Sequence, residues 1–200
     1  MKNLITILLF ALLTGCSNDS NSNPEAQLPP ITQTGANTFG CLIDGKLVKP
    51  REGSGSVGGS NAGASFYGGY PNPTDYYELD IRDLKSNKTS KILIHMQGVH
   101  QLGAGNYIIN ESNGMSSIDG YNHNYIHCRV FDQNTNSYQF YRSFENSGVL
   151  IITKYDFYNR IISGTFSCQV KNSANSTDII EITNGRFDIK WDTLPNVVFP

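Results

Sequence analysis

Hydrophobic and polar residues alternate with a period of two along most of the chain beyond residue 38. In "YYELDIRD" at 76–83, the apolar Tyr77, Leu79 and Ile81 share one face and the charged residues between them share the other. This is the pattern of a half-solvated β-strand. Comparable runs lie at 91–97, 106–109, 125–131, 138–142, 148–155, 161–170, 178–183 and 185–191, and two shorter runs lie within 38–50.

The links between these runs predict antiparallel pairing. They are short and rich in Asn, Gly and Ser, as hairpin connections are. Asp44-Gly45 and Asn184-Gly185 are residue pairs that favour a two-residue hairpin turn. Beyond the N-terminal segment, no window of ten residues shows convincing helical periodicity. We therefore predict an all-β fold, an antiparallel β-sandwich or a flattened β-barrel of about ten strands, in a single β-domain over 38–200.

The start of the chain does not follow this pattern. Lys2 precedes an apolar run at 4–13, and small residues then lead to Cys16, which is the order of a secretory signal. The apolar run is shorter than the roughly 20 residues that a membrane-spanning helix needs. "LTGC" at 13–16 resembles the bacterial lipobox, whose cysteine is lipidated before the signal is removed. The alternative is an ordinary signal peptide in which the cysteine occurs by chance.

These features divide the N-terminal region into two parts. We expect a lipoprotein signal peptide at 1–15, followed by lipidation of Cys16, for example with palmitate. Residues 16–37 are rich in Ser, Asn and Pro and lack hydrophobic periodicity, which predicts a flexible stalk. Acyl chains would anchor the protein to a membrane without spanning it. We therefore expect an exported protein that is lipid-anchored in the bacterial cell envelope, with the outer membrane as its expected location.

Charge and cysteine content narrow the classes of partner. The formal net charge is −2 over 200 residues, and no basic cluster is present, which argues against nucleic acid as a partner. With Cys16 lipidated, Cys41, Cys128 and Cys168 remain, so at most one disulfide can form within the chain. The sequence does not indicate which two would pair. Each shares a face with apolar neighbours, so buried free thiols are the default expectation.

Two segments carry residue types that metal sites use. His123 and His127 are four residues apart, about 13 Å on an extended chain, which is too far to bind one ion directly. The segment that starts at Asp132 resembles a calcium loop, but Ser137 replaces the required glycine and Ser143 the required glutamate. A polar hairpin explains the same residues. We therefore expect no metal site and no cofactor.

Residues suited to catalysis are not grouped in a recognisable motif. No Gly-x-Ser-x-Gly elbow lies between a strand and a helix. Glu78 and Asp80 are two apart on one strand face, where outward-facing charges usually serve solubility. The chain has 11 tyrosines and 10 phenylalanines. Such aromatic residues suit sugar stacking and protein interfaces, although tyrosine is also simply a good strand former. We assign no catalytic residue.

Three quoted segments resemble a known group of proteins. They are "TGANTFGCLIDGKLVKP" after the stalk, "ITKYDFYNRIISGTFSCQV", and "IIEITNGRFDIKW" near the C-terminus. Together they resemble an uncharacterised Bacteroidetes-type lipoprotein family, a domain of unknown function, which implies a fold and a lipid anchor but no activity. Asp192-Thr193-Leu194 also resembles the tripeptide at which such bacteria O-glycosylate exported proteins, which implies Thr193 as a modification site.

Three functional hypotheses follow. The favoured one is an envelope lipoprotein of unknown molecular function that acts as a non-catalytic binding or interaction module. Its partners would be the membrane, through the lipid anchor, and a glycan, a small ligand or another envelope protein. The second is a structural or assembly lipoprotein without a small ligand. The third, less favoured, is a hydrolase whose site the sequence does not reveal.

Overall fold

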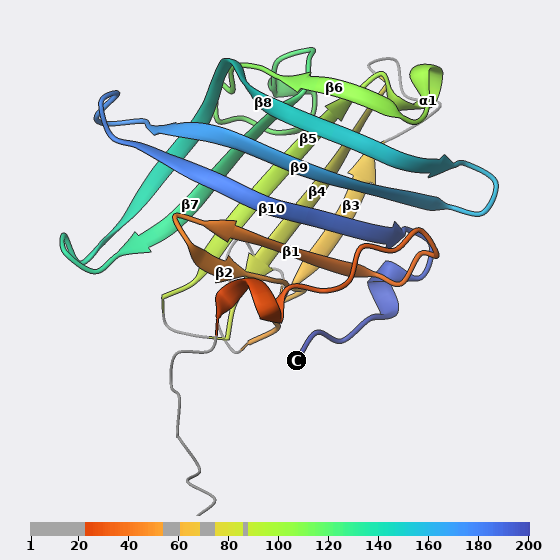
Figure 1. Cartoon of the computed structure of the whole chain (residues 1–200), viewed down its shortest axis with the longest axis horizontal. Helices are drawn as coiled ribbons and strands as arrows, with labels where there is room; N and C mark the ends of the chain where they lie inside the picture. The colour runs from red at the N-terminus through yellow and green to blue at the C-terminus, as the bar shows by residue number, and fades with distance from the viewer. Residues whose placement is uncertain (1–22, 54–60, 69–74, 86–87) are drawn as a thin grey trace, which may run out of the picture.

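The structure is a computed structural model that describes residues 23–53, 61–68, 75–85 and 88–200 (Figure 1). Within these ranges, ten antiparallel strands form one sheet that curls into a half-barrel. The strands are β1 (Thr38–Ile43), β2 (Lys46–Val48), β3 (Ala64–Gly68), β4 (Tyr76–Asp83), β5 (Ser90–Gln97), β6 (Gly105–Ile109), β7 (Tyr125–Asp132), β8 (Ser137–Asp156), β9 (Ile161–Asn172) and β10 (Ile179–Lys190). The shorter elements are α1 (Val99–Leu102) and the 3-10 turns η1 (Pro24–Gln27), η2 (Ser117–Asp119) and η3 (Leu194–Asn196). The predicted antiparallel all-β fold of about ten strands is confirmed.

The strand order around the sheet is β2-β1-β10-β9-β8-β7-β5-β4-β3, with β6 paired to the second half of β8. β8 is 20 residues long, and its first half pairs with β7. The runs predicted at 138–142 and 148–155 are therefore two parts of one strand. A register shift between Ser143 and Gly148 in the pairing with β9 separates them. β8 thus holds two different neighbours at opposite ends of the half-barrel (Figure 1).

The hairpin turn predicted at Asn184-Gly185 is wrong. β10 continues through this pair, and its pairing with β9 shifts register between Ile182 and Gly185. The pair forms a bulge, with Asn184 at φ 54°. A side chain at Gly185 would lie 2.5 Å from the ring of Phe166, so only glycine fits this close approach. The turn predicted at Asp44-Gly45 does form, between β1 and β2, with φ values of 50° and 71°.

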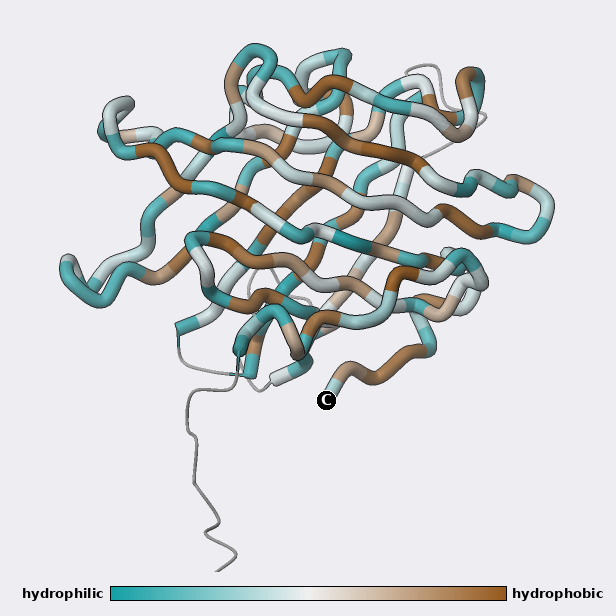
Figure 2. The backbone as a smooth tube through the Cα atoms, viewed as in Figure 1, coloured by the Kyte–Doolittle hydropathy of each residue, from teal (hydrophilic) through white to brown (hydrophobic). Residues whose placement is uncertain are grey.

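The inner face of the sheet is an apolar core. The alternation of apolar and polar residues is visible along the strands in Figure 2. Leu79 and Ile81 on β4 are fully buried, and Cys41, Cys128 and Cys168 are buried with them. Within the described residues, all three cysteines are free thiols. Burial raises the pKa of these thiols, that of Cys128 to about 12, so they remain protonated.

An aromatic cluster packs β3 and β4 at one end of the sheet against the ends of β8 and β10. The rings of Phe66 and Trp191 stack with centroids 5.6 Å apart, and those of Tyr155 and Trp191 with centroids 6.2 Å apart. The hydroxyls of Tyr77 and Tyr155 are 2.6 Å apart. β2 and β3 are the two ends of the strand order and are not paired to each other. Ring packing therefore joins the sheet ends on this side of the half-barrel, beside an isolated backbone bridge between Arg51 and Asp83.

A buried carboxylate connects the N-terminal segment to the sheet. Asp188 on β10 is 1% exposed, and six hydrogen bonds reach its two oxygens. The donors, at 2.6 to 3.3 Å, are Thr32 Oγ1, the N–H and Oγ1 of Thr34, the N–H groups of Gly35 and Ala36, and Ser163 Oγ. Burial alone would raise the pKa of Asp188, but the hydrogen bonds from Thr32 and Ser163, with those from the backbone, lower it to about 2.

Residues 24–37, expected to belong to the flexible stalk, lie against the half-barrel. η1 contacts β2, and Leu28 and Pro29 lie close to Gly40 of β1. The polar residues of this segment form the hydrogen bonds to Asp188. Hydrophobic periodicity within the segment does not reveal these long-range contacts. The signal peptide and residues 16–22 lie outside the described residues, so this division of the chain stays a prediction. No helix in the described ranges is long and apolar enough to cross a membrane.

We predict that Asp188→Asn destabilises the protein by about 2–4 kcal/mol. In the wild type the surrounding donors bond to a charged carboxylate, whereas in the variant some of them would face the NH₂ group of the amide, which cannot accept a hydrogen bond. The free energy of unfolding would be measured by urea denaturation. Asp192→Asn, at an exposed position four residues away, is the matched control and should change stability by less than about 0.5 kcal/mol. Equal stability of the two variants would contradict the proposed role of Asp188.

The same carboxylate predicts a pH dependence. Its pKa is about 2 in the folded chain and near the usual 3.8 in the unfolded chain. Because the folded value is the lower one, the stabilisation is complete above about pH 4 and is lost as the pH falls toward 2, a loss of about 2 kcal/mol. The unfolding free energy of Asp188→Asn should therefore fall less steeply than that of the wild type between pH 4 and pH 2.

Candidate functional site

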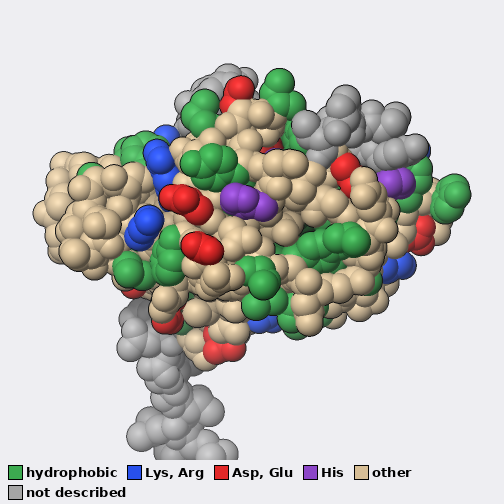
Figure 3. All heavy atoms as spheres, turned by 90° about the horizontal axis from the view of Figure 1, so that it is seen from above, with side chains coloured by type: hydrophobic (Ala, Val, Ile, Leu, Met, Phe, Trp, Pro, Cys, Tyr) green, Lys and Arg blue, Asp and Glu red, His purple; other side chains and the backbone are tan. Residues whose placement is uncertain are grey.

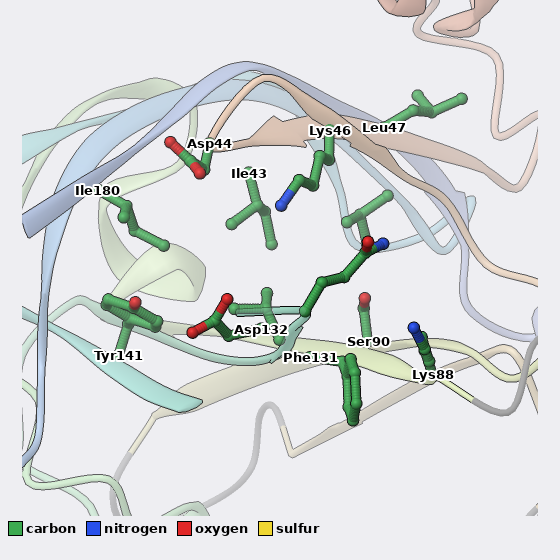
Figure 4. Close-up of a pocket in the computed structure, with 13 residues that line it drawn as sticks. Ile43, Asp44, Lys46, Leu47, Lys88, Ser90, Phe131, Asp132, Tyr141 and Ile180 are labelled. Carbon is green, nitrogen blue, oxygen red and sulfur yellow. The ribbon is translucent and has the colours of Figure 1, made fainter. Parts of the chain in front are cut away.

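A hollow of about 210 Å³ opens at the end of the half-barrel where the β1–β2 turn faces the β7–β8 turn (Figure 4). Its apolar lining comes from core positions on five strands: Ile43, Val48, Val130, Tyr141 and Ile180. Three of these side chains are less than 9% exposed and belong to the main core. The hollow is therefore a continuation of the barrel interior to the surface, a position at which β-barrels commonly bind ligands.

Charged side chains surround this apolar lining. Asp44 and Lys46 come from the β1–β2 turn, Asp132 ends β7, and Lys88 precedes β5. In Figure 4 the two aspartates lie toward one side of the hollow, near Ile180, and Lys88 lies toward the other. The hollow thus combines an apolar interior with acidic and basic groups at its rim.

Asp132 carries its charge at neutral pH. It accepts hydrogen bonds from the N–H of Asn134 at 2.9 Å and from the Oγ1 of Thr135 at 2.8 Å. These bonds hold the pKa of Asp132 below its usual range. The residues that resembled a calcium loop form a polar hairpin turn between β7 and β8, as the alternative explanation predicted. In the described ranges, no group of three or more His, Cys, Asp or Glu side chains is arranged to hold a metal ion.

A second polar site lies on the outer face of the sheet. Four rings stack in a row across β4, β5 and β7: Tyr76, His95, Tyr125 and His127. Successive centroids are 5.1, 4.4 and 6.0 Å apart. The carboxylate of Glu78 lies beside this row, 2.8 Å from Nδ1 of His95, and both side chains are at most 2% exposed. Burial, followed by the nearby Lys91 ammonium, lowers the pKa of His127 to about 4, so this imidazole is neutral at pH 7.

The connection between β6 and β7 covers this outer-face cluster. The N–H of Ser117 donates to Glu78 Oε1 at 2.7 Å, and the hydroxyl of Tyr125 donates to the carbonyl of Met115 at 3.0 Å. The Ser117 hydroxyl lies 2.7 Å from that of Tyr76. The cluster therefore holds the connection over residues 110–124 against the sheet.

The prediction that Glu78 and Asp80 are solvated is wrong, although both lie on the outer face as expected. Glu78 is 0% exposed because the 110–124 connection lies over it. Asp80 is 2% exposed and forms ion pairs with Arg82 at 2.6 Å and Lys91 at 3.2 Å. The sequence signal that could have revealed this is His95, a polar residue between two apolar ones at the position that pairs with Glu78.

A second hollow, of about 460 Å³, lies between this connection and the start of α1. Its lining includes Tyr76, His95, Gln97, Ser117 and Tyr121. The end of the barrel that carries α1 and β6 has acidic and histidine side chains among apolar ones (Figure 3). A carboxylate paired with a histidine beside a hollow is an arrangement that hydrolases use. However, within the described residues the Ser117 hydroxyl pairs with Tyr76 and forms no hydrogen bond with His95.

The other residues singled out in the sequence are placed apart. Nε2 of His123 lies 2.7 Å from the carbonyl oxygen of Glu111 at the surface, whereas His127 is mostly buried against Ser112. Thr193 is half-buried, and its hydroxyl accepts a hydrogen bond from Asn37 at 2.9 Å. O-glycosylation of this hydroxyl stays a prediction. Cys16 lies outside the described residues, so its lipidation also stays a prediction.

We predict that Glu78→Gln loosens the 110–124 connection, because the buried Ser117 N–H and His95 lose a charged acceptor, a change of about 1–3 kcal/mol. Hydrogen exchange at the Ser117 amide, followed by NMR, measures this directly. Glu145→Gln, at an exposed position on β8, serves as the control and should leave the exchange rate unchanged. An unchanged rate in Glu78→Gln would show that the carboxylate does not hold the connection.

Comparison with known proteins leaves the family open. No family model matches the chain, no curated protein matches it, and no solved structure matches it. The resemblance to a Bacteroidetes-type lipoprotein family therefore stays an expectation from the sequence.

Proposed function

We propose that this protein is a non-catalytic binding module of the bacterial cell envelope, held at the membrane by lipid on Cys16, and that it binds a small ligand in the hollow at the barrel end. The observation that carries the proposal is the combination of apolar core side chains in the lining, Ile43 and Val48 among them, with charged groups at the rim. A site of this kind supplies affinity through apolar burial and orientation through a few polar contacts.

The rest of the fold is consistent with binding. The hollow is built by rigid strands and by two tight turns, the positions from which binding residues are presented on a stable scaffold. Most buried tyrosines are committed to packing: Tyr107 and Tyr141 hydrogen-bond to Gly103 and Asp178 through their hydroxyls. Their abundance is therefore explained by the strands, and it does not by itself favour a glycan.

A structural or assembly role is the second candidate. Ile108 on β6 and Val149 on β8 are directly paired on the outer face and are 54% and 42% exposed, and Ile151 extends this apolar stripe. Exposed apolar groups that lie together suit contact with another protein. This role requires no ligand in the hollow, so the two candidates are distinguished by the experiment below.

We predict that Ile180→Trp abolishes ligand binding by filling the hollow. The purified protein would be titrated with a mixture of amino acids, monosaccharides and short carboxylic acids, and amide shifts of the β1–β2 and β7–β8 turns would be followed by NMR. Shifts in the wild type that Ile180→Trp eliminates would support the proposal. Ile179→Trp is the matched control, because Ile179 is the adjacent residue, is 48% exposed and does not line the hollow.

Two outcomes would contradict the proposed site. Absence of any shift at these turns in the wild type would favour the assembly role. Equal binding by the wild type and Ile180→Trp would place the ligand elsewhere. Circular dichroism of both tryptophan variants checks that each has kept the fold.

The lipid anchor has its own test. We predict that labelled palmitate is incorporated into the wild-type protein and not into Cys16→Ala when both are produced in a bacterial host that carries the lipoprotein pathway. Cys41→Ala is the control, because this thiol is buried in the core and should not affect labelling. Equal labelling of wild type and Cys16→Ala would refute the anchor and leave the ligand-binding proposal intact.

A further inference from the structure

The size of the hollow at the barrel end limits what it can hold. Its volume of about 210 Å³ is below the roughly 300–1,000 Å³ of sites for drug-sized ligands. Core side chains form its inner wall, so the part of a ligand that enters deepest meets an apolar surface. The ligand class is therefore a small molecule that carries an apolar group.

Charge at the rim adds a second constraint. Within the described part of the chain, neither the carboxylate of Asp44 nor the ammonium of Lys46 takes part in an ion pair or a side-chain hydrogen bond, although the two residues flank the same turn. Asp132 is ionised, as its hydrogen bonds with the hairpin turn require. Acidic and basic groups both line the hollow, and the Lys46 ammonium is near enough to Asp132 to help lower the pKa of that carboxyl.

A ligand with a single charge would satisfy only part of this rim. A cation would be attracted by Asp44 and Asp132 but repelled by Lys46, and an anion would meet the reverse arrangement. A molecule that carries both charges on one carbon framework can place each charge beside a group of the opposite sign. Its apolar group can then point toward Val130 and Ile180 in the interior.

We propose that the hollow binds a small zwitterion with an apolar group, the chemistry of a free aliphatic amino acid. Its ammonium lies toward Asp44 and Asp132, its carboxylate toward Lys46, and its side chain against Ile43, Val130 and Ile180. This inference rests on the proposed function, since it names the ligand class of the same site.

Three probes of one shape test the inference: leucine, leucine amide and N-acetylleucine. They carry the same apolar side chain, but only leucine has both charges, since the amide removes the carboxylate and acetylation removes the ammonium. We expect leucine to bind about threefold to fivefold more tightly than either derivative, the effect of one exposed ion pair. Affinities would be obtained by NMR titration of the β1–β2 turn amides in the full chain.

Two substitutions assign the charges. Lys46→Gln should weaken the binding of leucine and N-acetylleucine about threefold to fivefold and leave the affinity for leucine amide unchanged. Asp44→Asn should weaken leucine and leucine amide and leave N-acetylleucine unchanged. Asparagine tolerates the left-handed backbone at this position, where φ is 50°, so the turn is retained. Asp119→Asn and Lys154→Gln, which do not line this hollow, are the matched controls.

The outcomes separate this inference from the proposed function. Equal affinity for the three probes, or the same loss for all of them in both variants, would overturn the zwitterion class. The zwitterion class would also be overturned if none of the three probes binds while other compounds in the mixture bind at these turns and Ile180→Trp blocks that binding. In that case the proposed function would stand. If no compound of any class shifts these amides, both proposals fail.

Discussion

The carboxylate of Asp188 is the interaction on which the arrangement of the N-terminal segment depends. A buried ionised group is costly unless its hydrogen-bonding capacity is satisfied. Here six donors satisfy it, and five of them come from residues 32–36, more than 150 positions away in the sequence. Ser163 on β9 supplies the sixth. The N-terminal segment therefore crosses the outer face of β9 and β10, and η1 and Pro29 pack where this path leads, against β2 and β1.

The two ends of the incomplete barrel are joined on one side and open on the other. The end strands β2 and β3 do not pair with each other, and the backbone joins the two ends of the sheet only through an isolated bridge within the described residues, between Arg51, just after β2, and Asp83 on β4. On one side, the rings of Phe66, Tyr77, Tyr155 and Trp191 join the sheet ends. On the other, the chain leaves the apolar interior open between the β1–β2 and β7–β8 turns, and the hollow is found there. The candidate site is thus a consequence of the open sheet.

Local sequence patterns predicted the strands because the alternation of side chains between the two faces of a strand is a local property. Alternation at 76–83 identifies the buried face of β4 whatever the strand order, since side chains on a strand point to opposite faces in turn. The same reasoning failed at Asn184-Gly185. A turn-forming pair can equally make a bulge, and the choice depends on whether a long partner such as β9 pairs on both sides of it. Strand continuity is therefore a tertiary property that the residue pair does not encode.

The sites were less predictable because they depend on contacts far apart in the sequence. Asp188 and Glu78 both occupy outward-facing positions, where charge is expected to be solvated, and both are buried by segments that the strand pattern leaves unplaced. Likewise, Asp44 and Asp132 meet at one hollow only because the curled sheet brings two turns together across nearly 90 residues.

The polar groups of this protein differ in how far the fold itself satisfies them. Asp188 has six hydrogen bonds, as a structural role requires. Glu78 accepts from His95 and the Ser117 backbone through Oε1, while its Oε2 is buried without a hydrogen-bond partner in the described residues. Both oxygens of Asp75, by contrast, are buried without a hydrogen-bond partner in the described residues, and burial raises the pKa of this carboxyl toward the neutral form. Asp44 and Lys46 lie at the rim of the apolar hollow and form no ion pair or side-chain hydrogen bond within the described residues, so a ligand can displace their water without first breaking contacts that the fold uses.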